Sequence, residues 1–240
     1  MLQLVDFSCG YGKMVAVHDL NLTVQPGKIS ALLGANGAGK SSTLMGIAGH
    51  VSLKGGQIRF KGEDFSKKPP EVRVAAGIGL VPEGRRLFAE LTVHENLTIG
   101  GYCRAKDKTG PNMEKVLTLF PRLRERLQQR AAALSGGEQQ MVAIGRALMS
   151  EPELLLVDEL SLGLMPKAVD DCYAVLDTLK KEGLAIVVVE QSTQRVLDVA
   201  DEVTVLESGR LVYFGAREEL KNASDMVDAY LGLSSLEKSL

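Results

Sequence analysis

The stretch Gly34-Ala35-Asn36-Gly37-Ala38-Gly39-Lys40-Ser41 decides the fold, because it matches the pattern GxxxxGK(S/T) of phosphate-binding loops. The apolar run Ile29–Leu33 before it predicts a buried strand, and a helix is expected from near Gly39 to about Ala48. Glycine allows positive φ, so the backbone can turn its N–H groups inward, and the helix N-terminus adds a positive dipole. Strand, loop and helix together predict a site for the phosphates of a nucleotide.

Two side chains at the end of this phosphate loop have separate expected tasks. Lys40 would reach the β- and γ-phosphates, and the Ser41 hydroxyl would ligate Mg²⁺. A glycine-rich turn without a ligand is the alternative, which the Lys–Ser pair and the flanking strand and helix disfavour. We therefore expect phosphate binding by Gly34, Asn36, Gly37, Ala38, Gly39, Lys40, Ser41 and Ser42.

Two acidic residues follow the aliphatic run Leu154–Val157, which predicts another buried strand. Side chains at the carboxyl end of a strand in an open α/β sheet face the ligand crevice. Asp158 is expected to ligate Mg²⁺ or to hold one of its ligands, and Glu159 to accept a proton from the water that attacks the γ-phosphate. Acids that only cap the next segment are the alternative, which the phosphate loop disfavours.

Strand and helix patterns alternate along most of the chain. Further strands are predicted at Ile78–Val81, Ala185–Val189 and Val203–Leu206, while Leu20–Val24 and Gln57–Phe60 predict short strands near the start. Alternation of this kind implies a parallel sheet covered on both faces. The prediction is an α/β fold: a P-loop NTPase core with a mostly parallel sheet, an N-terminal antiparallel β subdomain and an inserted helical subdomain.

The helical insertion is expected over about residues 84–152, with hinges near Glu83 and Glu153. Thr92 and Glu95 form a predicted capping box at a helix start within it. The chain is then a single domain, 1–240, whose core comprises about 1–83 and 153–240. Arg122, Arg126 and Arg130 lie four apart and predict a basic stripe on one helix face, either solvated or facing lipid or nucleic acid.

Composition excludes several classes of protein. Twenty-eight basic and thirty acidic residues give a net charge of −2, so the chain has no overall basic field that would attract nucleic acid. Nucleic acid is therefore not expected as a partner. The apolar runs are of strand length, far below the roughly 18 residues that span a bilayer. The start has no basic and apolar pattern of a secretory signal. Cys9, Cys103 and Cys172 are widely spaced without CxxC, which fits a reducing compartment.

The segment Leu134-Ser135-Gly136-Gly137-Glu138-Gln139-Gln140, below called the signature segment, predicts a second anion site. Ser135 and Glu138 have the spacing of a capping box, and two glycines leave the first helical turn without side chains. Its bare N–H groups and positive dipole would attract phosphate. The chain thus has two helix ends suited to phosphate, and both could serve one nucleotide if two chains met head to tail.

With these three motifs in this order, the sequence resembles the ATP-binding-cassette (ABC) ATPases over almost its whole length. In that family, the signature segment of one subunit closes over ATP held by the phosphate loop of the other. The resemblance implies Mg²⁺-dependent ATP hydrolysis. It also implies nucleotide contacts from Ser135, Gly136, Gly137 and Glu138, where Glu138 stands at a position that is usually Gln.

Other site residues are implied only by this resemblance. Tyr11 stands where the family stacks an aromatic ring on adenine, and Glu83 stands at a hinge position, usually Gln, that touches Mg²⁺. Gln191 replaces the usual switch His. Gln can hydrogen-bond to the γ-phosphate but cannot shuttle a proton as imidazole does. Catalytic roles therefore fall to Glu159, Lys40 and, as a sensor, Gln191. Leu160 and Met165 depart from the usual Pro and Asp.

Three segments resemble one subgroup of the family, the ATP-binding subunits of high-affinity branched-chain amino-acid importers. These segments are Val81–Phe88, Val189–Gln191 and Ala229–Gly232. This implies a second cassette ATPase, identical or related, permease subunits in the membrane, a periplasmic solute-binding protein, and a location on the cytoplasmic face of the inner membrane. Import of leucine, isoleucine and valine is the expectation, and related systems carry urea, amides or other small solutes. Two other classes of protein are alternatives. A non-transport clamp protein of the family usually has two cassettes in one chain or a long coiled coil, and a P-loop GTPase would have an NKxD motif. The sequence has none of these features.

Overall fold

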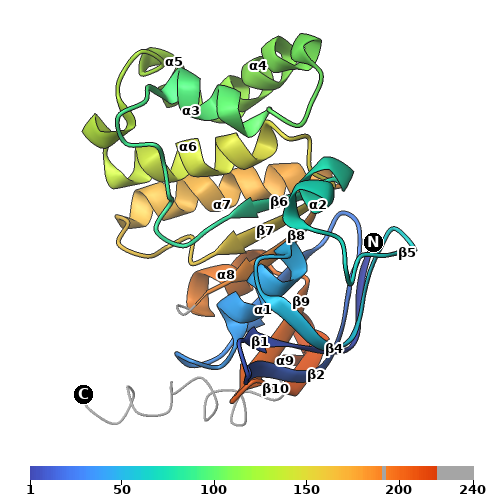
Figure 1. Ribbon diagram of the computed structural model, residues 1–240. Helices are drawn as coiled ribbons and strands as arrows, with labels where there is room; N and C mark the ends of the chain where they lie inside the picture. The colour runs from blue at the N-terminus through green and yellow to red at the C-terminus, as the bar shows by residue number, and fades with distance from the viewer. Residues whose placement is uncertain (191–192, 221–240) are drawn as a thin grey trace, which may run out of the picture.

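The computed structural model describes residues 1–190 and 193–220 (Figure 1). Its strands form two sheets. The antiparallel sheet has the order β2-β1-β4-β5, with β1 Leu2–Tyr11, β2 Met14–Val24, β4 Ser52–Phe60 and β5 Glu63–Asp64. The mixed sheet has the order β10-β9-β3-β8-β7-β6, with β3 Ile29–Leu33, β6 Ile78–Val81, β7 Leu154–Asp158, β8 Ala185–Val189, β9 Glu202–Glu207 and β10 Arg210–Ala216.

The strands β9, β3, β8, β7 and β6 are parallel, and only β10 runs antiparallel to its neighbour. The predicted α/β fold with a mostly parallel sheet and an antiparallel N-terminal sheet is confirmed. Two strands are longer than predicted, since Leu20–Val24 and Gln57–Phe60 are only the ends of β2 and β4. The first half of β4 reads Ser-Leu-Lys-Gly-Gly, so no apolar alternation marks it. Gly56 there has φ +74, and the register of β1 against β4 shifts opposite it.

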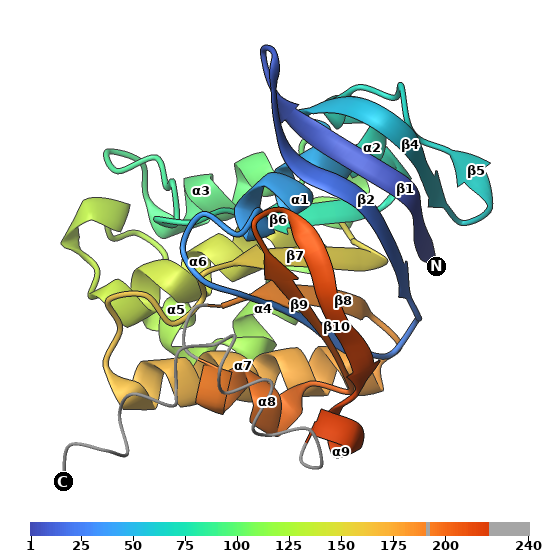
Figure 2. The ribbon, with the colours of Figure 1, turned by 90° about the horizontal axis from the view of Figure 1, so that it is seen from below.

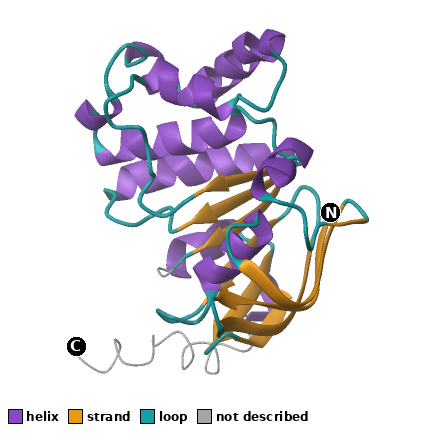
Figure 3. Cartoon of the chain, viewed as in Figure 1, coloured by secondary structure: helices purple, strands orange, loops and turns teal. Residues whose placement is uncertain are grey.

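Helices lie on both faces of the mixed sheet (Figure 2). The helices of the described residues are α1 Lys40–Ala48, α2 Pro70–Ala76, α3 Val93–Gly100, α4 Thr109–Leu119, α5 Pro121–Glu125, α6 Gly136–Leu148, α7 Pro166–Lys181, α8 Thr193–Val199 and α9 Arg217–Leu220. The helices α3 to α6 all come between β6 and β7 and gather at one end of the molecule, apart from most strands (Figure 3). The capping box of Thr92 and Glu95 at the start of α3 is confirmed.

The alternation of side chains along each parallel strand feeds two cores. In β7, Leu155 and Val157 pack with α6 and α7, whereas Leu154 and Leu156 pack with α1 and the antiparallel sheet. Both faces of the strand are therefore buried, as its unbroken aliphatic run predicts. The carboxyl ends of β3, β7 and β8 reach the same edge of the sheet, because these strands are parallel neighbours.

The predicted basic stripe is wrong. Helix α5 ends at Glu125, so Arg126 only caps it and Arg130 lies beyond it. The Arg126 guanidinium lies 3.6 Å from the carboxylate of Glu138, and that of Arg130 lies 3.3 Å from Glu90. These arginines therefore pair with acids on different segments and share no helix face.

No helix within the described residues combines the length and apolar character needed to cross a bilayer.

Candidate functional site

The phosphate loop joins β3 to α1 as its sequence predicts. The N-cap of α1 is Gly39, with φ +99 and no side-chain cap, so the first amide groups of the helix lack a partner inside it. Gly34 has φ +149, and a Cβ there would lie 2.3 Å from the carbonyl oxygen of Leu206. Glycine is thus required at Gly34 by both conformation and space.

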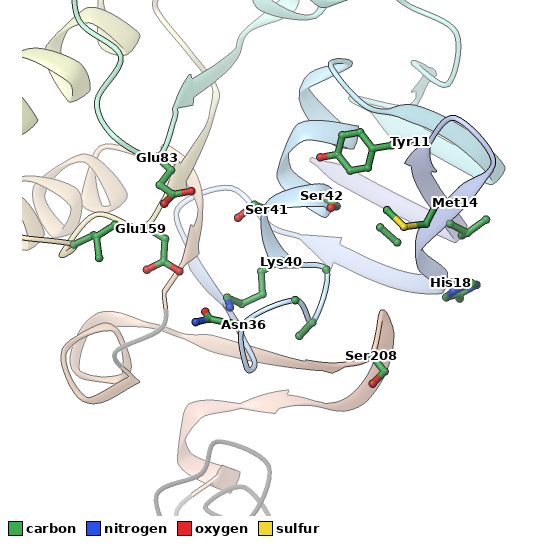
Figure 4. A pocket seen from close by; sticks show the side chains of 16 residues that line it. Tyr11, Met14, His18, Asn36, Lys40, Ser41, Ser42, Glu83, Glu159 and Ser208 are labelled. Atoms are coloured by element: carbon green, nitrogen blue, oxygen red, sulfur yellow. The ribbon is translucent and has the colours of Figure 1, made fainter.

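The loop encloses the ammonium group of Lys40. This side chain is 6% exposed, and its Nζ donates to the carbonyl oxygens of Gly34 at 2.8 Å and Ala35 at 3.1 Å. The Asn36 side chain lies next to the Lys40 ammonium group (Figure 4). A buried cation that two carbonyl oxygens hold at the N-terminus of a helix suits an anion.

Asp158 ends β7 and lies beside the first turn of α1. The Ser41 hydroxyl donates to its Oδ1 at 3.0 Å, while its Oδ2 is buried and has no hydrogen-bond partner among residues 1–190 and 193–220. Burial raises the pKa of the Asp158 carboxyl, the Ser41 bond and the charge of Lys40 lower it, and the charge of Glu83 raises it further. An unpartnered buried carboxylate oxygen, a hydroxyl and a second carboxylate form a donor set that Mg²⁺ accepts.

This donor set is smaller than a complete metal site. Among the described residues there is no group of three or more His, Cys, Asp or Glu side chains that could hold a metal ion. Mg²⁺ characteristically binds one or two carboxylates and takes its other ligands from phosphates and water. Ser41, Glu83 and Asp158 therefore fit a Mg²⁺ ion that arrives with a nucleotide.

Glu159 follows Asp158 and has φ +50, a conformation that is uncommon for any residue except glycine. Its backbone N–H donates to the carbonyl oxygen of Val189 at 2.9 Å, which ties it to the end of β8. The half-buried carboxyl group lies across the cleft from Lys40 and Ser41, on the same side as Glu83 (Figure 4). Its place suits a base beside the terminal phosphate.

Most of the predicted site residues share one cleft of about 690 Å³, but Gly34 and Asp158 do not line it. Asp158 lines a second pocket of about 520 Å³, which shares Tyr11, Ser41 and Glu83 with the cleft. The predicted residues that line the cleft come from β1, the phosphate loop, α1 and the carboxyl ends of β6 and β7: Tyr11, Asn36, Gly37, Ala38, Gly39, Lys40, Ser41, Ser42, Glu83 and Glu159. The Tyr11 side chain is half exposed and lies at the far end of the cleft from Glu159 (Figure 4). An aromatic ring in one part of the cleft and a cation with helix-end amides in another suit the base and the phosphates of a nucleotide.

The signature segment lies elsewhere. Ser135 is the N-cap of α6 and forms the predicted capping box, since its Oγ accepts from the Glu138 N–H and the Glu138 carboxylate accepts from the Ser135 N–H at 2.9 Å. The segment lines a smaller groove of about 180 Å³ together with Gly163, Leu164 and Met165. Of the residues that the structure describes, none lines both this groove and the larger cleft. Within one chain, the two predicted anion sites therefore remain apart.

Sequence reasoning missed part of the cleft wall. The residues Met14, Val15, Ala16 and His18 of β2 line the cleft, and so does Ser208. The turn at Gly12 and Lys13 pairs Tyr11 with Met14, so a hairpin reading of this turn would have found these residues. The predicted sensor Gln191 and the segment Ala229–Gly232 lie outside the described residues.

Comparison with known proteins gives consistent matches. The family model described as ABC transporter matches residues 17–161. The high-affinity branched-chain amino acid transport ATP-binding protein BraG of Pseudomonas aeruginosa is 47% identical over 232 residues, which cover 97% of this chain and 100% of that protein. The probable branched-chain amino acid transport ATP-binding protein LivF of Archaeoglobus fulgidus is 34% identical over 221 residues, 92% of this chain and 94% of LivF.

A solved structure agrees with the fold. The crystal structure of the ADP conformation of an ATP-binding cassette from an ABC transporter has a TM-score of 0.83 and 27% identity, and the match covers 92% of this chain and 93% of that one. The two sheets and the helices between β6 and β7 thus belong to an arrangement already known to hold a nucleotide.

Proposed function

We propose that this chain, which belongs to the ABC transporter family and is the ATP-hydrolysing subunit of a transporter, powers the import of branched-chain amino acids through a separate permease. One observation carries this proposal: 47% identity to the branched-chain amino acid transport protein BraG, without any part of that protein left unmatched. No residue of this chain is assigned to the solute, so the cargo rests on this kinship.

We assign the steps of hydrolysis to residues of the cleft. The phosphate loop and α1 would bind the triphosphate, with Lys40 opposing the charge of the β- and γ-phosphates. Mg²⁺, when bound by Ser41, Asp158 and Glu83, would neutralise phosphate charge and fix the oxygens. Glu159 would accept the proton of the attacking water. Gln191 is assigned the sensing of the γ-phosphate, and Tyr11 the stacking against adenine.

The separation of the two anion sites supports a site shared between two chains. Ser135, Gly136, Gly137 and Glu138 of one chain would cover the nucleotide held by another, in a head-to-tail pair of identical or related ATPases. ATP would favour the closed pair and hydrolysis would release it, because the contacts to the γ-phosphate are lost. Residues 84–152 would move as a lobe relative to 1–83 and 153–240 and carry this motion to the permease.

The location follows from these partners. We place the chain on the cytoplasmic face of the inner membrane, held there by the permease. A periplasmic solute-binding protein would deliver the amino acid on the other side.

Uptake in the source cell tests the cargo. Loss of this chain is expected to lower the uptake of labelled leucine, isoleucine and valine, and a wild-type copy is expected to restore it. A copy with Glu159→Gln is not expected to restore this uptake. The uptake of proline is the control and should not change. Unchanged leucine uptake with a loss of urea or amide uptake would contradict the proposed cargo.

Purification of the chain without any multi-span membrane protein would contradict the proposed permease.

Removal of the Ser41 hydroxyl tests the metal site. Ser41→Ala deletes one oxygen ligand and the hydrogen bond to Asp158 Oδ1. We expect the Mg²⁺ concentration for half-maximal ATP hydrolysis to rise by about 10- to 100-fold, as for removal of a group that orients a metal ligand. Nucleotide binding in excess EDTA, measured by fluorescence of a labelled ATP, should not change. An unaltered Mg²⁺ requirement would remove Ser41 from the metal site.

A further inference from the structure

Glu190 is a buried carboxylate beside the cleft to which the steps above give no task. It follows β8 directly and is 0% exposed. Its Oε1 accepts from the backbone N–H of Ser161 at 2.9 Å and from the Tyr173 hydroxyl at 3.0 Å, and its Oε2 accepts from Ser161 Oγ at 2.7 Å. Burial of a charged group is costly unless hydrogen bonds compensate it, so these donors make its position specific.

The Tyr173 hydroxyl is held as a donor in this arrangement. Burial raises the pKa of Tyr173, and the negative charges of Glu190 and Glu159 raise it further, whereas Arg195 lowers it. The hydroxyl therefore keeps its proton and donates a hydrogen bond to Glu190 Oε1. Tyr173 lies on α7 and is itself 5% exposed, so the Glu190 side chain is fixed from the helix side as well.

The segment that Glu190 holds starts at the proposed base. Glu159 has φ +50, and a strained conformation persists only where the surroundings fix it at more than one point. The Glu159 N–H donates to Val189 O, and two residues later both the N–H and the hydroxyl of Ser161 donate to Glu190. Leu160 between them is fully buried. The end of β8 thus holds the segment on both sides of Leu160.

We propose that Glu190 is a positioning residue for ATP hydrolysis: together with the carbonyl of Val189 it clasps residues 159–161 to β8 and so holds the Glu159 carboxyl at the cleft. This inference rests on the proposed function, which makes Glu159 the base. Glu190 itself does not line the cleft. The clasp therefore acts on the chemical step and leaves nucleotide binding to the phosphate loop.

A variant that fills the same space without an acceptor tests the clasp. Glu190→Met is expected to lower kcat by about 10- to 100-fold, because small displacements of a catalytic group have effects of this size. The KM for ATP is expected to stay within about twofold of wild type, since ground-state binding is not touched. Glu190→Gln should restore kcat, because its amide oxygen can accept from the Ser161 N–H and Tyr173 while its NH₂ donates to Ser161 Oγ.

Three further measurements complete the test. Glu182→Met makes the same chemical change at an exposed position and should leave kcat and KM unchanged. Glu190→Asp withdraws the carboxylate from Ser161 by one methylene, and it should lower kcat alone even if Glu190→Met fails to fold. Adding Ser161→Ala to Glu190→Met should cause no further loss, because both remove the same contact.

Several results would overturn the clasp. Wild-type kcat in Glu190→Met or Glu190→Asp would do so, as would an equal loss in Glu190→Gln and Glu190→Met, or fully additive losses with Ser161→Ala. Failure of the proposed function has a different signature, because Glu159→Gln would then hydrolyse ATP at the wild-type rate whatever residue 190 is.

Discussion

Glu159→Gln is expected to bind ATP as the wild type does and to lower kcat by about 10²–10⁴-fold, the usual contribution of a general base. The amide keeps the shape and the hydrogen-bonding oxygen of the side chain but cannot accept a proton from water. The backbone of Glu159 is held by its N–H bond to Val189, so the substitution changes the chemistry and not the local fold. Phosphate release in the steady state and equilibrium binding of a labelled ATP measure the two effects separately.

The control for this prediction is Glu182→Gln, which removes the charge of an exposed carboxylate that pairs with Lys115 at 2.8 Å. Its kcat should equal that of the wild type. Hydrolysis by Glu159→Gln at the wild-type rate would transfer the base role to another group. A loss of ATP binding in that variant would mean that Glu159 holds the nucleotide as well.

Ser135→Arg is expected to abolish hydrolysis while ATP binding to the single chain stays intact. The arginine side chain would fill the groove at the start of α6 and place its own guanidinium where the phosphates of a second chain's nucleotide are proposed to lie. Binding by the single chain persists because the cleft shares no residue with that groove. Steady-state hydrolysis and labelled ATP binding measure these two properties, and light scattering with ATP measures the pairing of chains.

Ser135→Ala separates the loss of the cap from the block. Both variants lose the hydroxyl of the capping box, which costs about 1 kcal/mol of stability. Only the arginine fills the groove, so only Ser135→Arg should prevent the pairing of chains in ATP. Unchanged ATP-dependent pairing in Ser135→Arg would refute a site shared between two chains.

Sequence alone predicted the features that local pattern determines. The phosphate loop lies between β3 and α1 because its strand, glycines and helix are adjacent in the chain, and both capping boxes depend on residues three apart. Asp158 lies beside Ser41, although 117 residues separate them, because the carboxyl ends of parallel strands meet at one edge of the sheet.

Features that depend on distant contacts were not predictable. Glu190 and Ser161 are 29 residues apart, and no sequence motif predicts the contact between them. The wall formed by Met14 and His18 is different, because it follows from the local hairpin at Gly12 and Lys13 and was open to prediction from that turn. Positive φ at Glu159 has no trace in composition or periodicity, because tertiary contacts alone hold it.

The rate of hydrolysis per chain, measured over a wide range of chain concentrations, tests most directly whether two chains complete one site. At each concentration, light scattering gives the mass, against 25.8 kDa for a single chain. The rate per chain should rise with concentration in step with the paired fraction and fall toward zero on dilution. A constant rate per chain from a species of single-chain mass would contradict the account.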